Sequence, residues 1–386
     1  MKKICVITGS RAEYGLMNRM MQLIREDVEL QLQVVVCNMH LSHEYGLTYR
    51  EIEADGFTID KKVYMLLSSD TMNASAKSIG LGVIGFADAY EDLNPDIIVV
   101  LGDRYEILAA VSAALIYKIP VAHLHGGEIS EGAFDDAIRH AITKMSHLHF
   151  TSTEAYRRRV IQMGEHPDTV FNVGALGCDN IRRISLMDKS ELEKSLNFNI
   201  DKNTILVTFH PVTMENNTAE TQFKELLSAI DVFNDLRVIF TLPNADTDSQ
   251  IIIKLIKDYV VQNPGKSTWF SSLGRQRYLS TLKYIKAVVG NSSSGIIEAP
   301  SFHIPTLNIG NRQKGRLAAA SVFNCNPIKA EIEEKLFLIM QACNAESLQN
   351  IVNPYDKANT AYEIVRILKE YKVEVVKKFY NIDGRC

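Results

Sequence analysis

The sequence lacks several features that would place it in a special class of protein. Its six cysteines are scattered without a CxxC pair, which is typical of reduced thiols rather than of a disulfide framework. No apolar run approaches the roughly 20 residues that a membrane-spanning helix needs, and the apolar segment in the opening MKKICVITGS is too short for a signal peptide. We therefore expect a soluble cytoplasmic protein that has no membrane partner.

An excess of basic residues is also missing. The chain has 42 Lys and Arg against 46 Asp and Glu, which gives a net charge of -4. A nucleic-acid-binding protein normally carries a basic face, so we expect no nucleic-acid partner. This balance does not exclude a local positive pocket for a phosphate group.

Strand patterns alternate with helical patterns along most of the 386 residues. The first strand pattern is KICVIT at 3–8, followed by a glycine and a helical pattern. A second alternating series begins at Asn203, with its last strand expected at 305–309 and mostly helical structure at 325–370. Such alternation predicts an α/β fold with parallel sheets and right-handed crossovers.

The length of the chain suits two domains of ordinary size. We predict two Rossmann-like halves, residues 1–174 and 175–365, facing each other across a cleft. In open α/β sheets, ligands bind outside the carboxyl ends of the strands. Polar residues that directly follow strand patterns are therefore the candidates for function.

In the first half, two neighbouring strand patterns end in acids, imidazoles and glycines. One is followed by Asp103 and Arg104, the other by His125 and Glu128, and Asp135 opens the next helical pattern. We predict acid–base chemistry for these acids and this histidine. For Asp135 the alternative is a helix N-cap that also pairs with a basic residue four positions on.

In the second half, the loop GNSSSGIIE at 290–298 joins a strand pattern to a helical one. Glycines admit a ligand close to the backbone, and N–H groups with hydroxyls suit a phosphate, so Ser292 and Ser293 are predicted to bind one. Glu298 could accept hydrogen bonds from ribose hydroxyls. The alternative for the serines is ordinary helix capping.

Arginines follow strand patterns in both halves. Arg312 and Arg316 lie in the second half, and Arg11 and Arg104 in the first. Guanidinium groups match phosphate oxygens, so these residues could clamp a diphosphate; solvated surface positions are the alternative for Arg312 and Arg316. His210 before Pro is a further acid–base candidate, with a structural turn as its alternative.

We predict no metal site and no cofactor. His40, His123 and His125 lack the HExxH spacing, and alternating residues of a strand point to opposite faces. The loop GSRAEYG is not a GxGxxG fingerprint, which argues against a dinucleotide.

The order of these motifs resembles the hydrolysing UDP-N-acetylglucosamine 2-epimerases of sialic acid biosynthesis. The matching pieces span residue 8 to about 316 and are TGSRAEYG, MHLSHEYG, VVLGDRYE, HLHGGE, DDAIRHAITK, FHPVT, PNAD, GNSSSGIIEAP and NIGNRQKGR. The resemblance implies a glycosyltransferase-B-like fold in which a C-terminal helix, about 366–386, packs back on the first domain. It also implies a homo-oligomer, a dimer or a tetramer.

The implied reaction is an elimination followed by hydration. UDP leaves across C1–C2 to give 2-acetamidoglucal, and water then adds to release N-acetylmannosamine. By the match, Asp103 and Asp135 are catalytic carboxylates and His210 is an essential histidine. The positions that match nucleotide-binding residues are Arg11, Arg104, Asn244, Ser292, Ser293, Glu298 and Arg312.

One departure and one alternative substrate accompany the resemblance. Many relatives have a glutamate where this chain has His125, so its role passes to His125, passes to Glu128, or is not needed in that form. A close branch of the family acts on UDP-N,N'-diacetylbacillosamine in the legionaminic acid pathway. The non-hydrolysing epimerases, which retain UDP on the sugar, are a further alternative.

Overall fold

The chain forms two compact units in the computed structural model, which describes residues 1–67, 71–212, 215, 218–244, 248–342, 348, 350–372 and 374–382. The first unit comprises Met1–Glu128, Asp135–Asn180 and Lys357–Cys386, and the second comprises Ile129–Phe134 and Ile181–Asp356. Residues 175–180 and 357–365 therefore group with the first unit, whereas the sequence pattern divided the chain at 174 and 365.

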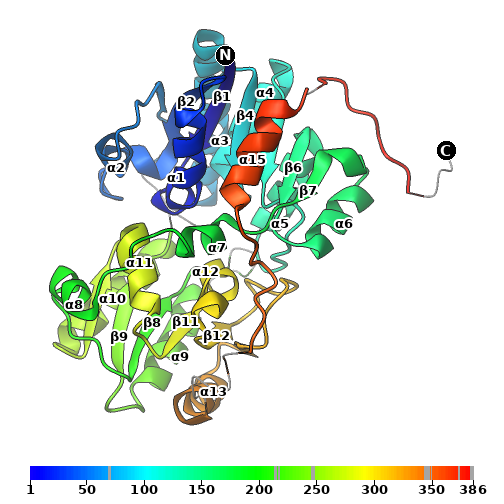
Figure 1. Ribbon diagram of the computed structural model, residues 1–386. Coiled ribbons are helices and arrows are strands. Elements are labelled where there is room, and N and C mark those ends of the chain that lie inside the picture. The colour runs from blue at the N-terminus through cyan, green and yellow to red at the C-terminus, as the bar shows by residue number, and fades with distance from the viewer. Residues whose placement is uncertain are drawn as a thin grey trace. The chain divides into compact units, whose positions relative to one another are not determined.

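The first unit contains a seven-stranded sheet of order β3-β2-β1-β4-β5-β6-β7, in which every pairing is parallel (Figure 1). Its elements are β1 (Lys2–Thr8), α1 (Arg11–Glu26), β2 (Leu30–Cys37), η1 (Asn38–Leu41), α2 (Tyr49–Ala54), β3 (Lys61–Val63), α3 (Met72–Leu93), β4 (Ile97–Leu101), α4 (Tyr105–Ile116), β5 (Val121–Leu124), α5 (Asp135–Met145), β6 (Leu148–Thr151), α6 (Glu154–Gln162), η2 (Pro167–Thr169), β7 (Val170–Asn172), α7 (Leu176–Ile181) and α15 (Thr360–Glu370).

The second unit contains a six-stranded sheet of order β10-β9-β8-β11-β12-β13, again parallel throughout. Its elements are α8 (Lys189–Leu196), β8 (Thr204–Thr208), α9 (Ala219–Ile230), β9 (Arg237–Thr241), α10 (Ser249–Gln262), β10 (Ser267–Phe270), α11 (Gly274–Leu282), β11 (Ala287–Gly290), α12 (Ser293–Ile297), η3 (Ala299–Phe302), β12 (Thr306–Ile309), β13 (Val322–Cys325) and α13 (Lys329–Ala342). The predicted fold class, two α/β halves with parallel sheets, is confirmed.

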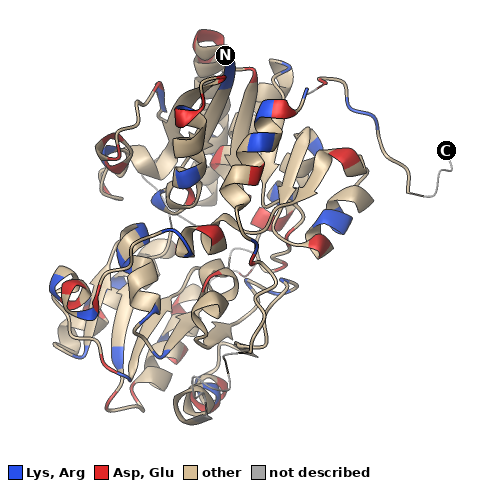
Figure 2. Cartoon of the chain, in the orientation of Figure 1, with Lys and Arg blue, Asp and Glu red and all other residues tan. Residues whose placement is uncertain are grey.

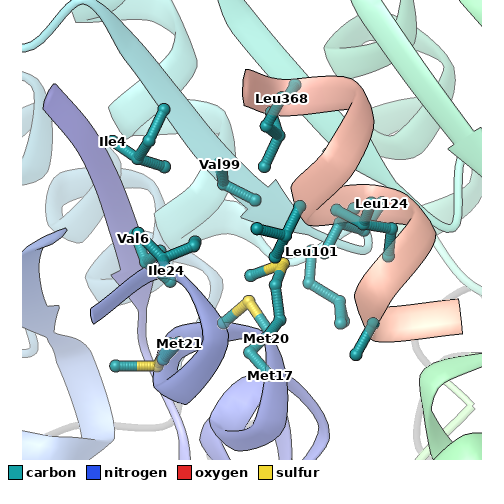
Figure 3. Close-up of a cluster of buried hydrophobic side chains, with 14 of the residues drawn as sticks. Ile4, Val6, Met17, Met20, Met21, Ile24, Val99, Leu101, Leu124 and Leu368 are labelled. Atoms are coloured by element: carbon teal, nitrogen blue, oxygen red, sulfur yellow. The ribbon is translucent and has the colours of Figure 1, made fainter. Parts of the chain in front are cut away.

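Continuous apolar runs explain why the central strands lie inside these sheets. All five residues of β4 are buried, as expected for a parallel strand with helices on both faces. On one face, α1 contributes Met17, Met20, Met21 and Ile24, all fully buried, to a cluster that includes Leu368 (Figure 3). Their helical spacing places them on one side of α1. Burial of each such side chain stabilises the unit by about 1.5–3 kcal/mol.

The C-terminal helix of the first unit lies against α1 (Figure 1). It spans Thr360–Glu370, so the predicted range of 366–386 is wrong. The helix begins early because the Asp179 carboxylate accepts hydrogen bonds from the backbone N–H groups of Asn359 and Ala361, both at 3.2 Å. These contacts satisfy donors that a helix start leaves open.

The sequence pattern missed a strand that forms one edge of the second sheet. β13 pairs in parallel with β12, although 305–309 was predicted to be the last strand. β13 has only four residues, three of them half-buried and one exposed, because it lies at the edge of the sheet. Such a strand has no continuous apolar run and gives a weak signal.

Charged residues of both signs are interspersed along the elements of each unit (Figure 2). Within the described ranges, no helix has both the length and the apolar composition needed to cross a bilayer.

Candidate active site

The strand order brings three polar loops of the first unit to the same edge of its sheet. β1, β4 and β5 are neighbours, and their carboxyl ends lead to Arg11, to Asp103 with Arg104, and to His125 with Glu128. The carboxyl edge of a parallel sheet is where ligands bind in this class of fold. The sequence-predicted residues of the first half therefore gather at the carboxyl edge of the sheet.

Asp103 is held by an arginine that the sequence analysis did not single out for function. The Arg139 guanidinium pairs with the Asp103 carboxylate and donates to the Glu128 carbonyl at 2.9 Å. It also lies 3.4 Å from the Asp136 carboxylate. Arg139 is 1% exposed, so these interactions form in a largely dry environment. One side chain thus ties the loops after β4 and β5 to α5.

Asp135 is the first residue of α5, where a carboxylate is favoured by the helix dipole. The observed ion pairs of Arg139 involve Asp103 and Asp136. The side chain of Asp135 is half-buried.

His125 has an unusual backbone conformation, and one nitrogen of its ring contacts Glu128. Its φ is +64°, a left-handed conformation that is uncommon for residues other than glycine. Its Nδ1 lies 3.1 Å from Oε1 of Glu128, and the Ser152 hydroxyl donates to the same oxygen at 2.7 Å. Within the described residues, its Nε2 is buried without a hydrogen-bond partner. This nitrogen is the group that a ligand or water could use.

Arg104 and Arg11 are both paired with glutamates in this structure. Nε of Arg104 donates to Glu106 at 2.8 Å. Nε of Arg11 donates at 2.6 Å to Glu51 of α2, and its Nη2 pairs with the same carboxylate. To clamp a phosphate, Arg11 must exchange this partner or share its charge with the ligand.

The other histidines near this edge are structural. His123 is fully buried, and its ring bonds the Gly102 carbonyl at 2.7 Å and the Thr143 hydroxyl at 3.2 Å. Burial lowers the pKa of His123 to about 3 and that of His40 to about 3, so both rings are neutral. No group of three metal-binding side chains occurs within the part of the chain that the structure describes.

In the second unit, β9, β8, β11 and β12 are neighbours, and their carboxyl ends carry the remaining candidates. His210 and Asn291 exchange two hydrogen bonds: the His210 N–H donates to the Asn291 amide oxygen at 2.7 Å, and the amide nitrogen donates to the His210 carbonyl at 2.8 Å. The Asn244 N–H donates to Nδ1 of His210 at 3.4 Å. A neutral ring that accepts at Nδ1 carries its proton on Nε2.

The serine-rich loop begins with an unusually close backbone approach. Gly290 has φ of +130°, and a Cβ there would lie 2.0 Å from the Thr208 carbonyl, so only glycine fits. Ser292 occupies the N-cap of α12 without a side-chain cap bond. The Ser294 hydroxyl donates to Glu298 at 2.6 Å, which leaves Ser292 and Ser293 outside that interaction. Helix capping therefore does not account for these two serines.

Arg312 follows β12 and is anchored to the same loop. Its Nη1 donates to the Asn291 carbonyl at 3.2 Å, and Gln313 donates to that oxygen at 2.9 Å. A Cβ on Gly132 would lie 2.5 Å from the Asn311 carbonyl, so segment 129–134 packs closely on this turn of the second unit. Thr213 of FHPVT and the last two residues of PNAD lie outside the described residues.

Several hydrogen-bonding partners of the candidate residues were missed in both units. No role was predicted for Arg139, Glu51, Glu106, Ser152 or Asn291, although the quoted motifs DDAIRHAITK, VVLGDRYE and GNSSSGIIEAP contain three of them. The signal available was their position after a strand or on the helix that follows one, and the strand order needed to pair them was not known from the sequence.

Known proteins resemble this chain along most of its length. The model of the family described as UDP-N-acetylglucosamine 2-epimerase matches residues 22–369. The GDP/UDP-N,N'-diacetylbacillosamine 2-epimerase (hydrolyzing) of Campylobacter jejuni is 44% identical over 323 residues, covering 84% of each chain. The polysialic acid biosynthesis protein P7 of Escherichia coli is 40% identical, covering 99% of this chain and 98% of the relative.

Solved structures share the fold. The crystal structure of UDP-GlcNAc 2-epimerase from Neisseria meningitidis bound to UDP-GlcNAc has a TM-score of 0.79 at 18% identity. The match covers 96% of this chain and 100% of that one. At this identity the likeness concerns the architecture of the two parallel sheets.

Proposed function

The chain belongs to the UDP-N-acetylglucosamine 2-epimerase family, and we propose that it is a hydrolysing member that converts UDP-N-acetylglucosamine and water into N-acetylmannosamine and UDP. The observation that carries this proposal is the placement of Asp103, His125 and Glu128 at the ends of β4 and β5. It is supported by 44% identity to a relative whose name states hydrolysis.

The first step is an elimination. A carboxylate removes the proton from C2, the C1–O bond breaks, its electrons leave with UDP, and the C2–H electrons form the C1=C2 bond of 2-acetamidoglucal. The C2 proton is only weakly acidic until the C1–O bond stretches, so proton removal and stabilisation of the departing diphosphate must coincide. We assign proton transfer to Asp103 or Asp135.

The second step adds water across the double bond. The water oxygen bonds to C1, its proton passes to a base, and a proton is delivered to C2 on the face opposite to the one from which it was lost. His125 suits this work because an imidazole ring can accept a proton at one nitrogen and donate one from the other, and its Nε2 has no protein partner among the described residues. The hydrogen-bonded Glu128 orients its other nitrogen.

We propose that nucleotide-binding residues are found among the cationic and hydroxyl groups at the strand ends of each unit. The candidates in the second unit are Ser292, Ser293 and Arg312. The motif match adds Asn244 and Glu298. Arg11 and Arg104 are their counterparts in the first. UDP-GlcNAc bound to the Neisseria structure supports a UDP-sugar as the ligand. His210, whose Nε2 carries the proton in the neutral ring, can donate to a phosphate or a sugar oxygen.

A second candidate substrate is UDP-N,N'-diacetylbacillosamine. The name of the Campylobacter relative supports it, and that name also includes a GDP-linked sugar. The name of the Escherichia coli relative states polysialic acid biosynthesis, which agrees with the sialic acid pathway that the motif resemblance implies. The two sugars differ at C4 and C6, so the same elimination applies to both.

Product analysis with each sugar nucleotide tests the proposal. The enzyme is incubated separately with UDP-N-acetylglucosamine, UDP-N,N'-diacetylbacillosamine and its GDP counterpart, and kcat/KM is compared. We expect UDP-N-acetylglucosamine to have the highest kcat/KM and to give free N-acetylmannosamine and UDP. A higher value for a diacetylated sugar supports the second candidate, a retained UDP-sugar supports the non-hydrolysing alternative, and no turnover of any of the three contradicts both.

Substitution of the acid–base candidates tests their roles. We expect Asp103→Asn and His210→Ala each to lower turnover by at least ~100-fold, the low end for loss of a general acid or base. UDP affinity should survive the Asp103→Asn change. Exposed counterparts, Asp168→Asn and His166→Ala, serve as controls because their side chains are 85% and 52% exposed. Near-normal rates in both test variants would remove the assignment.

We also propose a homo-oligomer. Two packed helices of the first unit expose large apolar side chains: Leu81 and Ile84 on α3 are 41% and 64% exposed, and Leu115 and Ile116 on α4 are 50% and 77% exposed. Clustered apolar exposure of this kind marks interaction surfaces. The molar mass in solution, measured by light scattering, distinguishes a monomer from a dimer or tetramer.

A further inference from the structure

The first unit contains two buried glutamates that both contact Gly9, and one of them also bonds Arg104. Glu106 in α4 is 0% exposed, and Glu13 in α1 is 5% exposed. Oε1 of Glu106 accepts from Nε of Arg104 at 2.8 Å, and Oε2 of Glu13 accepts from the Gly9 N–H at 2.7 Å. The second oxygen of each carboxyl group is buried without a hydrogen-bond partner among the described residues. Burying a carboxyl oxygen without a hydrogen-bond partner destabilises the fold, so such a group calls for an explanation.

Gly9 shows that the two carboxyl groups belong to one closely packed cluster. A Cβ at this position would lie 2.6 Å from Oε1 of Glu106. Gly9 also donates its N–H to Glu13, so a single residue contacts both acids. It follows β1, the neighbour of β4 in the sheet, and therefore lies at the proposed ligand-binding edge.

The carboxyl groups around Arg104 outnumber the basic side chains that act on Glu13. Burial and then repulsion from Glu106 raise the pKa of Glu13 to about 8, although the Gly9 N–H and Arg104 act in the opposite direction. Asp103 adds to the repulsion. Burial also raises the pKa of the nearby Cys37 thiol well above its usual value, so this thiol is neutral. Near neutral pH the cluster therefore retains one proton, on a carboxyl group beside Arg104.

We propose that Glu106 positions Arg104 and that Glu13 and Glu106 together set the net charge that its guanidinium presents to an anionic substrate. Glu106 orients the guanidinium through its charge-assisted hydrogen bond. Glu13 is a neutral neighbour while it keeps its proton and becomes a second negative charge when it loses it. This inference rests on the proposed binding of a UDP-sugar at this edge.

The proposal predicts a specific pH dependence of binding. When Glu13 loses its proton, the added charge opposes the attraction between Arg104 and a diphosphate. One unit charge several ångströms away in a medium of intermediate dielectric changes affinity by about tenfold. We therefore expect the Kd of UDP and the KM of the UDP-sugar to rise about tenfold from pH 7 to pH 9, while kcat changes much less.

Glu13→Gln is the decisive variant, because the amide keeps the shape and still accepts from Gly9 but cannot ionise. The ratio of the UDP Kd at pH 9 to that at pH 7, measured by calorimetry, should fall to about one. Glu106→Gln should move the rise in Kd to lower pH, because the repulsion that helps Glu13 keep its proton is gone. Glu26→Gln, an exposed change on the same helix, should keep the wild-type ratio.

The outcomes separate this inference from the proposed function. A Glu13→Gln variant that keeps the full wild-type ratio would overturn the inference, as would a wild-type ratio near one. If Glu13→Gln does not fold, an unshifted rise in Glu106→Gln would overturn it. A wild-type enzyme that releases no UDP from any UDP-sugar refutes the proposed function. In that case the ratio of the UDP Kd at pH 9 to that at pH 7 still tests the role of Glu13 and Glu106.

Discussion

Arg139 is a buried cation that interacts with three groups of the first unit, and a substitution can measure what these interactions contribute to stability. Arg139→Met keeps most of the side-chain volume but removes the hydrogen bonds to Asp103, Asp136 and the Glu128 carbonyl. A hydrogen bond to a charged group contributes about 1.5–3 kcal/mol. The side chains of Asp103 and Asp136 are 25% and 27% exposed, so solvent screening reduces their share. We expect the variant to lose about 3 kcal/mol of unfolding free energy.

The two units provide separate spectroscopic signals for this test. The single tryptophan, Trp269, lies in the second unit, so its fluorescence follows that unit, whereas far-ultraviolet circular dichroism follows both. Urea unfolding of Arg139→Met should shift the circular dichroism transition of the first unit and move the fluorescence transition less. Arg158→Met is the matched control on α6, because that side chain is 79% exposed; its expected loss is below about 0.5 kcal/mol.

A double-mutant cycle assigns part of this loss to the ion pair. In the Asp103→Asn background, the cost of Arg139→Met should be smaller by about 1–2 kcal/mol, because the charge that Arg139 neutralises is already gone. A loss below about 1 kcal/mol for Arg139→Met alone, or a cost unchanged by Asp103→Asn, would refute the view that this arginine holds the Asp103 carboxylate.

Two further perturbations follow from the structure. Arg312→Ala should weaken UDP binding by about tenfold or more through loss of a charge-assisted contact, and calorimetry that finds unchanged affinity would count against the clamp. For Glu165, burial alone would raise the pKa, but His149, Lys144 and Lys377 outweigh it and lower the pKa to about 2. Its ionised form therefore contributes stability that is complete above about pH 4.5 and is lost as the pH falls toward 2. The stability difference between wild type and Glu165→Gln should shrink between pH 6 and pH 3; a constant difference would contradict this.

Much of the fold could be predicted because its central strands are buried on both faces. β4 and β5 appear in the sequence as apolar runs that end in glycine-rich polar loops, and the family resemblance drawn from those loops is confirmed. Elements at the periphery gave weaker signals. Three of the four residues of β13 are only half-buried and the fourth is exposed, and the start of α15 depends on Asp179, which lies about 180 residues away in the chain.

Part of the candidate site could likewise be predicted from the sequence and part could not. Residues that directly follow strands could be proposed from sequence, but their partners could not. Asp103 meets Arg139 across 36 residues, Arg11 meets Glu51 across 40, and the His210 backbone meets Asn291 across 81. Each pairing depends on which strands are neighbours, and strand order is a property of the folded chain.

The most direct test of the proposed mechanism is proton NMR of the reaction with UDP-N-acetylglucosamine in D₂O. Elimination followed by hydration predicts free N-acetylmannosamine carrying deuterium at C2, released together with UDP. A free product that keeps protium at C2, or a 2-epimer that retains UDP, would contradict the mechanism.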